Sequence, residues 1–213
     1  MLDIVLIRHG ETAWNAERRM QGHLDVDLNE TGLRQAELLA QALQDERFDA
    51  LYCSDLSRAR KTAAPLAAAQ GLTPVVDSGW RERCYGGFEG HSYDEISKLF
   101  PEAYAAMLAR SKDYRYPQGA NTAETLQEFS ARAVGSLMRA IDAGGRRIAI
   151  VTHGGVLDCI NRHVRGMDLS LPRDFETPNT GVNRLTWDGC GLKIVQWANL
   201  EHLAGLALDE IDR

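Results

Sequence analysis

A cationic and an imidazole side chain stand next to each other near the start of the chain, directly before a glycine. Arg8 carries a permanent charge, and Gly10 lets backbone amides approach an anion closely. Between them, His9 can act as a nucleophile when its imidazole is neutral, attacking phosphorus in line with a departing alkoxide. Such an attack divides one difficult displacement into two easier steps, phosphorylation of the histidine and its later hydrolysis. The three residues therefore indicate phosphoryl transfer, with Arg8 holding the phosphoryl oxygens.

A second histidine occupies a similar place later in the chain. Leu2 to Arg8 and Arg147 to Thr152 are apolar and partly β-branched, which predicts two strands buried on both faces of a parallel sheet. His9 follows the first of these strands and His153 the second. Ligands of such sheets bind beyond the carboxyl ends of the strands. We therefore expect both histidines at one site.

Alternating strands and helices must position these side chains. Helical spacing of apolar residues predicts six helices. The first begins at Asn29, and the second begins after a capping residue at Ser54 or Asp55. The others are predicted over 93–100, 102–109, 123–141 and 154–165. Further strands are predicted over 50–53 and 74–77, followed by a hairpin over 182–188 and 192–197. The pattern predicts one domain over residues 1–213, an α/β fold with a mostly parallel sheet in a three-layer α/β/α sandwich.

Four motifs stand in a defined order along the chain. They are Arg8-His9-Gly10-Glu11-Thr12, Ser54-Asp55-Leu56-Ser57-Arg58-Ala59, Arg81-Glu82-Arg83 with Gly86-Gly87-Phe88-Glu89-Gly90 after it, and Thr152-His153-Gly154-Gly155. Together with Trp14-Asn15 and Gln21-Gly22, they resemble the histidine phosphatase superfamily, which includes the cofactor-dependent phosphoglycerate mutases. The resemblance covers nearly the whole chain and implies the phosphoglycerate mutase-like form of the α/β fold.

The resemblance also implies roles for the matching residues. His9 becomes the phosphorylated nucleophile, and Glu82 the donor of a proton to the leaving oxygen, which we expect to be protonated when substrate is bound. Glu11 and Glu89 are alternative carboxylates for that role. The phosphate pocket is formed by Arg8, Arg58 and His153, with Asn15, Gln21, Gly22 and Gly154 as further phosphate-binding residues.

Three functions are compatible with these motifs. Mutases of the family typically have a small hydroxyl residue where this chain has Gln21, and Asn-Ser where it has Gly155-Val156. The segment 91–120 also lacks the rich basic cluster with which mutases hold a bisphosphorylated intermediate. These departures favour a phosphatase over a cofactor-dependent mutase, and a non-catalytic phosphometabolite-binding protein is the alternative of another class. Phosphoglycerate, sugar phosphates, nucleotide monophosphates and ribazole phosphate all stay open as substrates.

Composition limits the partners. A net charge of −6 argues against broad attraction to nucleic acid or an anionic membrane, so the expected partner is a small phosphorylated metabolite. Paired Asp/His ligands and CxxC pairs are absent from the sequence, which predicts no metal, no other cofactor and reduced thiols. Without a long apolar segment or a basic leader we expect a cytoplasmic protein. A monomer and a homodimer both suit this architecture.

Overall fold

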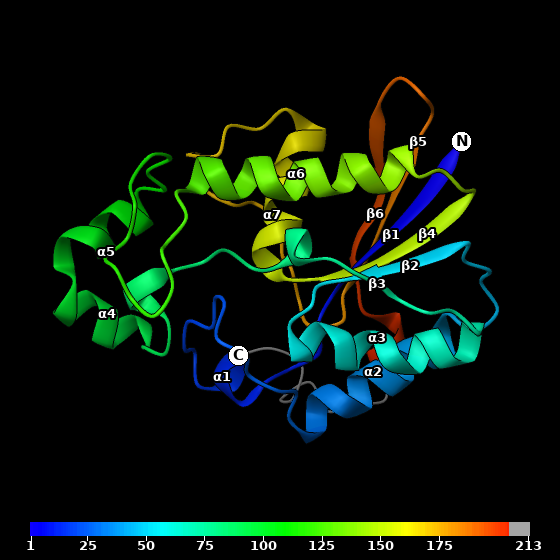
Figure 1. Cartoon of the computed structure of the whole chain (residues 1–213), viewed down its shortest axis with the longest axis horizontal. Coiled ribbons are helices and arrows are strands. Elements are labelled where there is room, and N and C mark those ends of the chain that lie inside the picture. The colour runs from blue at the N-terminus through cyan, green and yellow to red at the C-terminus, as the bar shows by residue number, and fades with distance from the viewer. Residues whose placement is uncertain (205–213) are drawn as a thin grey trace.

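Six strands form one sheet in the order β3-β2-β4-β1-β5-β6 in the computed structural model, which describes residues 1–204 (Figure 1). Their bounds are β1 (Leu2–Arg8), β2 (Ala50–Cys53), β3 (Val75–Val76), β4 (Arg147–Thr152), β5 (Val182–Trp187) and β6 (Leu192–Asn199). The first four are mutually parallel, whereas β5 is antiparallel to both of its neighbours. The predicted mostly parallel sheet is confirmed, together with the hairpin at its edge.

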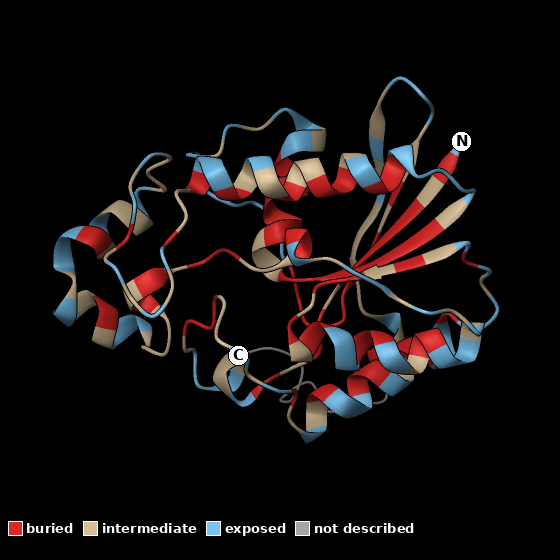
Figure 2. Ribbon diagram, viewed as in Figure 1, coloured by how far each residue is buried: buried red, intermediate tan, exposed pale blue. Residues whose placement is uncertain are grey.

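Alternate side chains of the buried strands point into two different cores. Ile4 and Leu6 of β1 pack in one core with residues of α6 (Leu126–Asp142) and α7 (Gly154–Arg165), whereas Val5 and Ile7 pack in the other with residues of α2 (Glu30–Ala42) and α3 (Ser57–Gln70). Figure 2 shows the central strands β1 and β4 mostly buried, and α2, α3 and α6 buried mainly on the sides that face the sheet. This arrangement confirms the three-layer α/β/α sandwich.

Helix starts differ in how they are capped. Asn29 caps α2 as predicted, accepting a 2.8 Å bond from the Gly32 amide. The long helix predicted from residue 123 instead begins at Leu126, because Thr125 and Glu128 form a capping box. The cap predicted for α3 at Ser54 or Asp55 is wrong, since the capping position is Leu56 and its side chain makes no such bond. The distant Asp25 replaces it, accepting from the Ser57 amide at 2.7 Å.

A separate group of short elements lies beyond the carboxyl ends of the parallel strands (Figure 1). It contains α4 (Tyr93–Leu99), α5 (Pro101–Leu108) and a short 3-10 turn at 86–88, whereas a second such turn at 78–80 packs against α6. Phe88, Ile96 and Tyr116 form a small apolar core within it. The sequence did not predict α1 (Ala13–Ala16), a four-residue helix that begins after Thr12. Elsewhere, η3 (Glu201–Leu203) follows β6. None of the helices in residues 1–204 is long and apolar enough to span a membrane.

Candidate active site

The register of β1 and β4 brings the two histidines together. Arg8 is paired with Thr152, and these are the last residues of the two parallel strands. The residues that follow them, His9 and His153, therefore lie at the same edge of the sheet. Their ring centroids are 5.0 Å apart in an edge-on arrangement. Both histidines are almost completely buried: His9 is 3% exposed and His153 is 0% exposed.

The hydrogen bond of His9 fixes which of its nitrogens carries a proton. Nδ1 lies 2.7 Å from the Gly10 carbonyl oxygen. Because a carbonyl only accepts, Nδ1 is the donor and the lone pair is on Nε2. Burial, and then the charges of Arg58 and Arg8, hold the pKa of His9 well below its ordinary value. His9 is therefore a neutral imidazole whose Nε2 is available for attack.

Arg58 and His153 form a hydrogen-bonded pair behind His9. Nε of Arg58 donates to Nδ1 of His153 at 3.3 Å, so the proton of the His153 ring is on Nε2. That nitrogen is buried and makes no hydrogen bond to any described residue. The pKa of His153 is also far below its ordinary value, chiefly because of burial. His153 is thus a neutral donor with an unused N–H.

Backbone carbonyls hold Arg58 in place. Its Nη2 donates to the Gly22 carbonyl at 2.7 Å, and its Nη1 to the Leu24 carbonyl at 2.9 Å. Burial lowers the pKa of Arg58 to about 10, which leaves it charged at neutral pH. The segment 21–24 and α3 are therefore joined by a cation that no carboxylate of the described residues neutralises by an ion pair.

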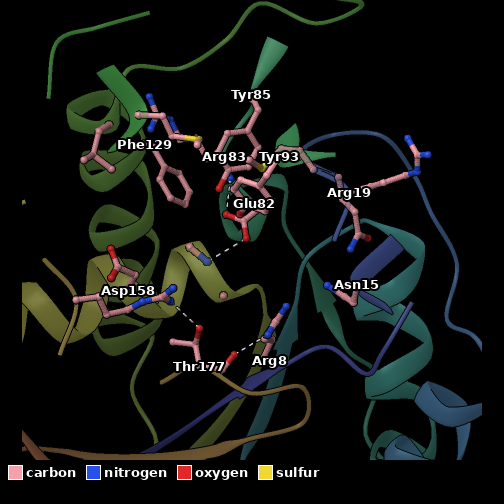
Figure 3. A pocket seen from close by; sticks show the side chains of 18 of the residues that line it. Arg8, Asn15, Arg19, Glu82, Arg83, Tyr85, Tyr93, Phe129, Asp158 and Thr177 are labelled. Atoms are coloured by element: carbon pink, nitrogen blue, oxygen red, sulfur yellow. Dashed lines mark hydrogen bonds between the residues drawn. The ribbon is translucent and has the colours of Figure 1, made fainter. Parts of the chain in front are cut away.

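Of the three candidate carboxylates, only Glu82 lines the cavity. Its two oxygens accept from the amides of Arg83 at 2.7 Å and Gly155 at 2.9 Å, the second of which is drawn in Figure 3. These two backbone donors fix the orientation of the carboxyl group. Glu11 instead accepts from the Asn29 side chain at 2.6 Å, and Glu89 accepts from the backbone of His23 and Tyr85.

The predicted residues surround a cavity of about 360 Å³. Those that line it are Arg8, His9, Asn15, Gln21, Gly22, Arg58, Glu82 and Gly154, whereas His153 lies directly behind His9. Asn15 is oriented by Thr12, whose amide and hydroxyl both donate to its Oδ1 at 3.1 and 3.0 Å. Its amide nitrogen consequently faces the cavity (Figure 3). The structure thus gathers all the predicted site residues in one place.

More arginines line the cavity than the motifs indicated. Six arginines line it: Arg8, Arg19, Arg58, Arg83, Arg110 and Arg173, of which only Arg110 belongs to the segment 91–120 that the sequence analysis described as poor in basic residues. Arg19 pairs with Glu95 at 3.0 Å and Arg110 with Asp158 at 2.7 Å. The cluster was missed because its members come from separate segments, and only folding assembles them.

The cavity has two ends that differ in burial. We call the enclosed part around His9, Arg58 and His153 the inner end, where each side chain is at most 3% exposed. The outer end contains Tyr93, Arg110 and Arg173, of which Tyr93 is 46% exposed and Arg173 is also exposed. Tyr93 and Arg110 belong to the 91–120 segment, and Arg173 to the loop that follows α7.

Gly155 allows the close approach of Glu82. A Cβ atom at this position would lie 2.1 Å from Glu82 Oε1 and 3.0 Å from a ring carbon of Phe129. Any larger residue must therefore displace the carboxyl group. The sequence singled out Gly155 as a departure from the mutase pattern, and the structure gives that departure a physical meaning.

Comparisons with known proteins give concordant results. Residues 4–200 match the family model of the histidine phosphatase superfamily (branch 1). Phosphoglycerate mutase-like protein 4 of Arabidopsis thaliana is 40% identical over 204 residues, covering 94% of this chain and 86% of that protein. The structure of Bacillus stearothermophilus YhfR is 29% identical, with a TM-score of 0.85 over 95% of this chain and all of that one.

A third similar protein is named for a phosphatase activity. It is Entamoeba histolytica phosphoserine phosphatase, whose structure is in complex with 3-phosphoglyceric acid. It is 26% identical to this chain, with a TM-score of 0.83 over 95% of this chain and 100% of that one.

Proposed function

Because this chain belongs to the histidine phosphatase superfamily, we propose that it is a metal-independent phosphatase that hydrolyses a small phosphomonoester through a phosphohistidine intermediate. The observation that carries the proposal is the neutral His9, whose Nδ1–H is bound to the Gly10 carbonyl and whose Nε2 is left with a lone pair. A nucleophile in this state needs no separate base. His9 also lines the cavity, where an ester can reach it.

In the first step, Nε2 of His9 forms a bond to phosphorus while the bond from phosphorus to the alcohol oxygen breaks. The departing oxygen takes the proton of Glu82, and an alcohol is released. Charge on the three phosphoryl oxygens is stabilised by the guanidinium groups of Arg8 and Arg58 and by the free Nε2–H of His153. These groups are fixed before substrate binds, so they need little reorganisation.

In the second step, water attacks phosphorus and the bond to Nε2 of His9 breaks. Glu82, now ionised, takes a proton from that water, and inorganic phosphate leaves. The two amides that bind Glu82 hold its carboxyl group in place between the steps. The proton taken from water restores the acid for the next turnover.

Gly155 supports hydrolysis over mutase activity. The mutase pattern places asparagine there, and its Cβ alone would collide with Glu82 in the position described above. A mutase is nevertheless a specific alternative, because the Arabidopsis relative is named phosphoglycerate mutase-like. The name of the Entamoeba protein supports including phosphoserine and 3-phosphoglycerate among the substrates to be tested.

The experiment compares the purified protein with His9→Ala in the presence of a strong chelator. The substrates are 3-phosphoglycerate, phosphoserine, sugar phosphates, nucleotide monophosphates, ribazole phosphate and p-nitrophenyl phosphate, with and without 2,3-bisphosphoglycerate. We expect release of phosphate that falls at least about 10³-fold in His9→Ala. His163→Ala, which changes an exposed histidine at the end of α7, serves as the matched control and should keep the activity.

Two results would contradict the proposal. Formation of 2-phosphoglycerate from 3-phosphoglycerate, stimulated by the bisphosphate, would establish the mutase. Binding of phosphate esters by calorimetry without turnover of any of them would establish a phosphometabolite-binding protein.

A further inference from the structure

Arg173 is held against the wall of the cavity that carries Arg8. Its Nη1 donates to the Thr177 hydroxyl at 3.0 Å, and the Thr177 carbonyl accepts from Arg8 Nη1 at 2.7 Å (Figure 3). Thr177 itself is buried. This short chain of contacts orients the Arg173 guanidinium although the residue is exposed. An exposed arginine that is oriented in this way loses less conformational entropy when it binds a ligand.

The charge of Arg173 is not neutralised by any described residue. Arg19 and Arg110 also line the cavity, but each makes an ion pair with a carboxylate. Asp158 lines the cavity as well, and it is already shared between Arg110 and Arg162. Within residues 1–204, Arg173 makes no ion pair and only the one neutral hydrogen bond to Thr177. Its positive charge is therefore available to an anionic ligand.

The depth of the cavity decides which part of a substrate Arg173 meets. The phosphoryl group has to reach Nε2 of His9, which is at the buried inner end. The alcohol part of the ester then extends toward the outer end, where Arg173 is exposed. Because the phosphate is already surrounded by donors at the inner end, an additional cation at the outer end corresponds to an additional anionic group.

Tyr93 lies on the other side of the outer end and is also a hydrogen-bond donor. It is the first residue of α4, whereas Arg173 belongs to the loop after α7. Burial raises the pKa of the Tyr93 hydroxyl, and the charge of Arg173 is the largest influence in the opposite direction. Both side chains line the same cavity, and the tyrosine stays protonated at neutral pH.

We propose that Arg173, with Tyr93 opposite, binds a carboxylate on the alcohol part of the substrate, so that this protein prefers small phosphomonoesters that carry a second acidic group. This inference rests on the proposed phosphatase function. A charge-assisted pair of hydrogen bonds between guanidinium and carboxylate corresponds to a preference of about 10- to 100-fold. The cavity of about 360 Å³ is of a size that suits a small metabolite.

The test uses two esters that differ in one group. 3-Phosphoglycerate has a carboxylate where glycerol 3-phosphate has a hydroxymethyl group, and the rest of the two molecules is the same. We expect kcat/KM of the protein to be about 10- to 100-fold higher for 3-phosphoglycerate. Arg173→Gln should remove most of this preference, by lowering kcat/KM for 3-phosphoglycerate much more than for glycerol 3-phosphate. Arg173→Lys, which keeps the charge, should retain part of it.

Controls separate this effect from a change in the fold. Arg34→Gln removes an exposed cation from α2, away from the cavity, and should leave both substrates unaffected. An equal loss for both esters in Arg173→Gln would overturn the inference, because the arginine would then act on the phosphate or through Thr177 on Arg8. An unchanged preference in Arg173→Gln would overturn it as well.

Binding measurements keep the inference testable if no ester is hydrolysed. The dissociation constants of both esters are measured by calorimetry for His9→Ala and for His9→Ala combined with Arg173→Gln. We expect the single variant to bind 3-phosphoglycerate about 10- to 100-fold more tightly than glycerol 3-phosphate, and the double variant to bind them nearly equally. Equal binding by the single variant would overturn the carboxylate site, whereas a difference without turnover would refute only the phosphatase.

Discussion

The inner end of the cavity is built from the ends of buried strands, whereas the outer end is built from a loop and short helices. His9 and His153 each follow a strand in which nearly every residue is buried, and Arg58 is held by two backbone carbonyls. At the outer end, Tyr93 and Arg173 are exposed, and Arg173 has a single hydrogen bond. A rigid frame thus surrounds the reacting phosphate, and a more adaptable one surrounds the group attached to it.

This difference separates two tasks. Transition-state stabilisation needs donors that are fixed to within a fraction of an ångström, and the sheet supplies that precision. Selection among substrates needs side chains that can change without disturbing the chemistry, and surface loops tolerate such changes. Substitutions at the inner end should therefore affect every ester, whereas those at the outer end should affect some esters more than others.

Glu82→Gln should give the largest effect of the substitutions that follow, and that effect should depend on the leaving group. Alkyl phosphates need a proton on the departing oxygen, so we expect kcat to fall about 10²- to 10⁴-fold for them. p-Nitrophenyl phosphate releases a stabilised anion and should lose far less. Steady-state kinetics with the two kinds of ester measures this. Equal losses for both would mean that Glu82 is not the acid.

Arg58→Met should lower kcat/KM by about 10² to 10³ for every ester. It removes a cation from the phosphate and also leaves the carbonyls of Gly22 and Leu24 without their donor. The free energy of unfolding should therefore fall by about 1–3 kcal/mol, as measured by urea denaturation. If the loss were confined to esters with a second acidic group, Arg58 would belong functionally to the outer end.

Gly155→Ala tests whether Glu82 requires the space beside it. The added Cβ would lie 2.1 Å from Glu82 Oε1, so the carboxyl group must move and we expect about a 10-fold loss of kcat on alkyl phosphates. In combination with Glu82→Gln the two losses should not add. Gly135→Ala in α6 is the matched control, since its Cβ meets only a side-chain nitrogen at 3.5 Å and should leave activity unchanged. Full additivity in the double variant would show that Gly155 acts independently of Glu82.

Lowering the pH should decrease the free energy of unfolding, because the inner end contains two buried histidines. His9 and His153 have pKa values well below the ordinary 6.5, because burial opposes their charged forms. Below pH 6.5 the unfolded chain therefore binds protons that the folded chain does not, and stability falls as the pH decreases. We expect a slope of up to about 1.4 kcal/mol per pH unit for each histidine between pH 6 and 5. Urea denaturation across this range should give a smaller slope for His153→Asn, and an identical slope would argue against the linkage.

The inner end was largely predictable from the sequence because its residues are adjacent to strong local signals. The apolar runs before His9 and His153 predict strands, and parallel strands place such residues at one edge. The roles of Arg58 and Glu82 came from resemblance to known motifs, because no local pattern relates them to either histidine. The cap of α3 could not be predicted, since Asp25 reaches it only after folding.

The outer end could not be predicted for a related reason. Tyr93, Arg110 and Arg173 are separated along the chain. The position of Arg110 depends on hydrogen bonds to Leu169 and Asp158, and that of Arg173 on one hydrogen bond to Thr177. An isolated arginine in a sequence is usually an ordinary surface residue. Only the arrangement of α4, α5 and the loop after α7 distinguishes these three from the other polar residues of the chain.

The place of β1 in the sheet also determines when the catalytic centre can form during synthesis. This strand is synthesised before both of its neighbours, β4 and β5, and the paired residues Asp3 and Arg147 are 144 positions apart. A nascent chain that ends before residue 187 therefore cannot complete the sheet around His9. Until then, the apolar segment over residues 4–7 lacks the neighbouring strand that covers it in the folded protein and stays accessible to chaperones.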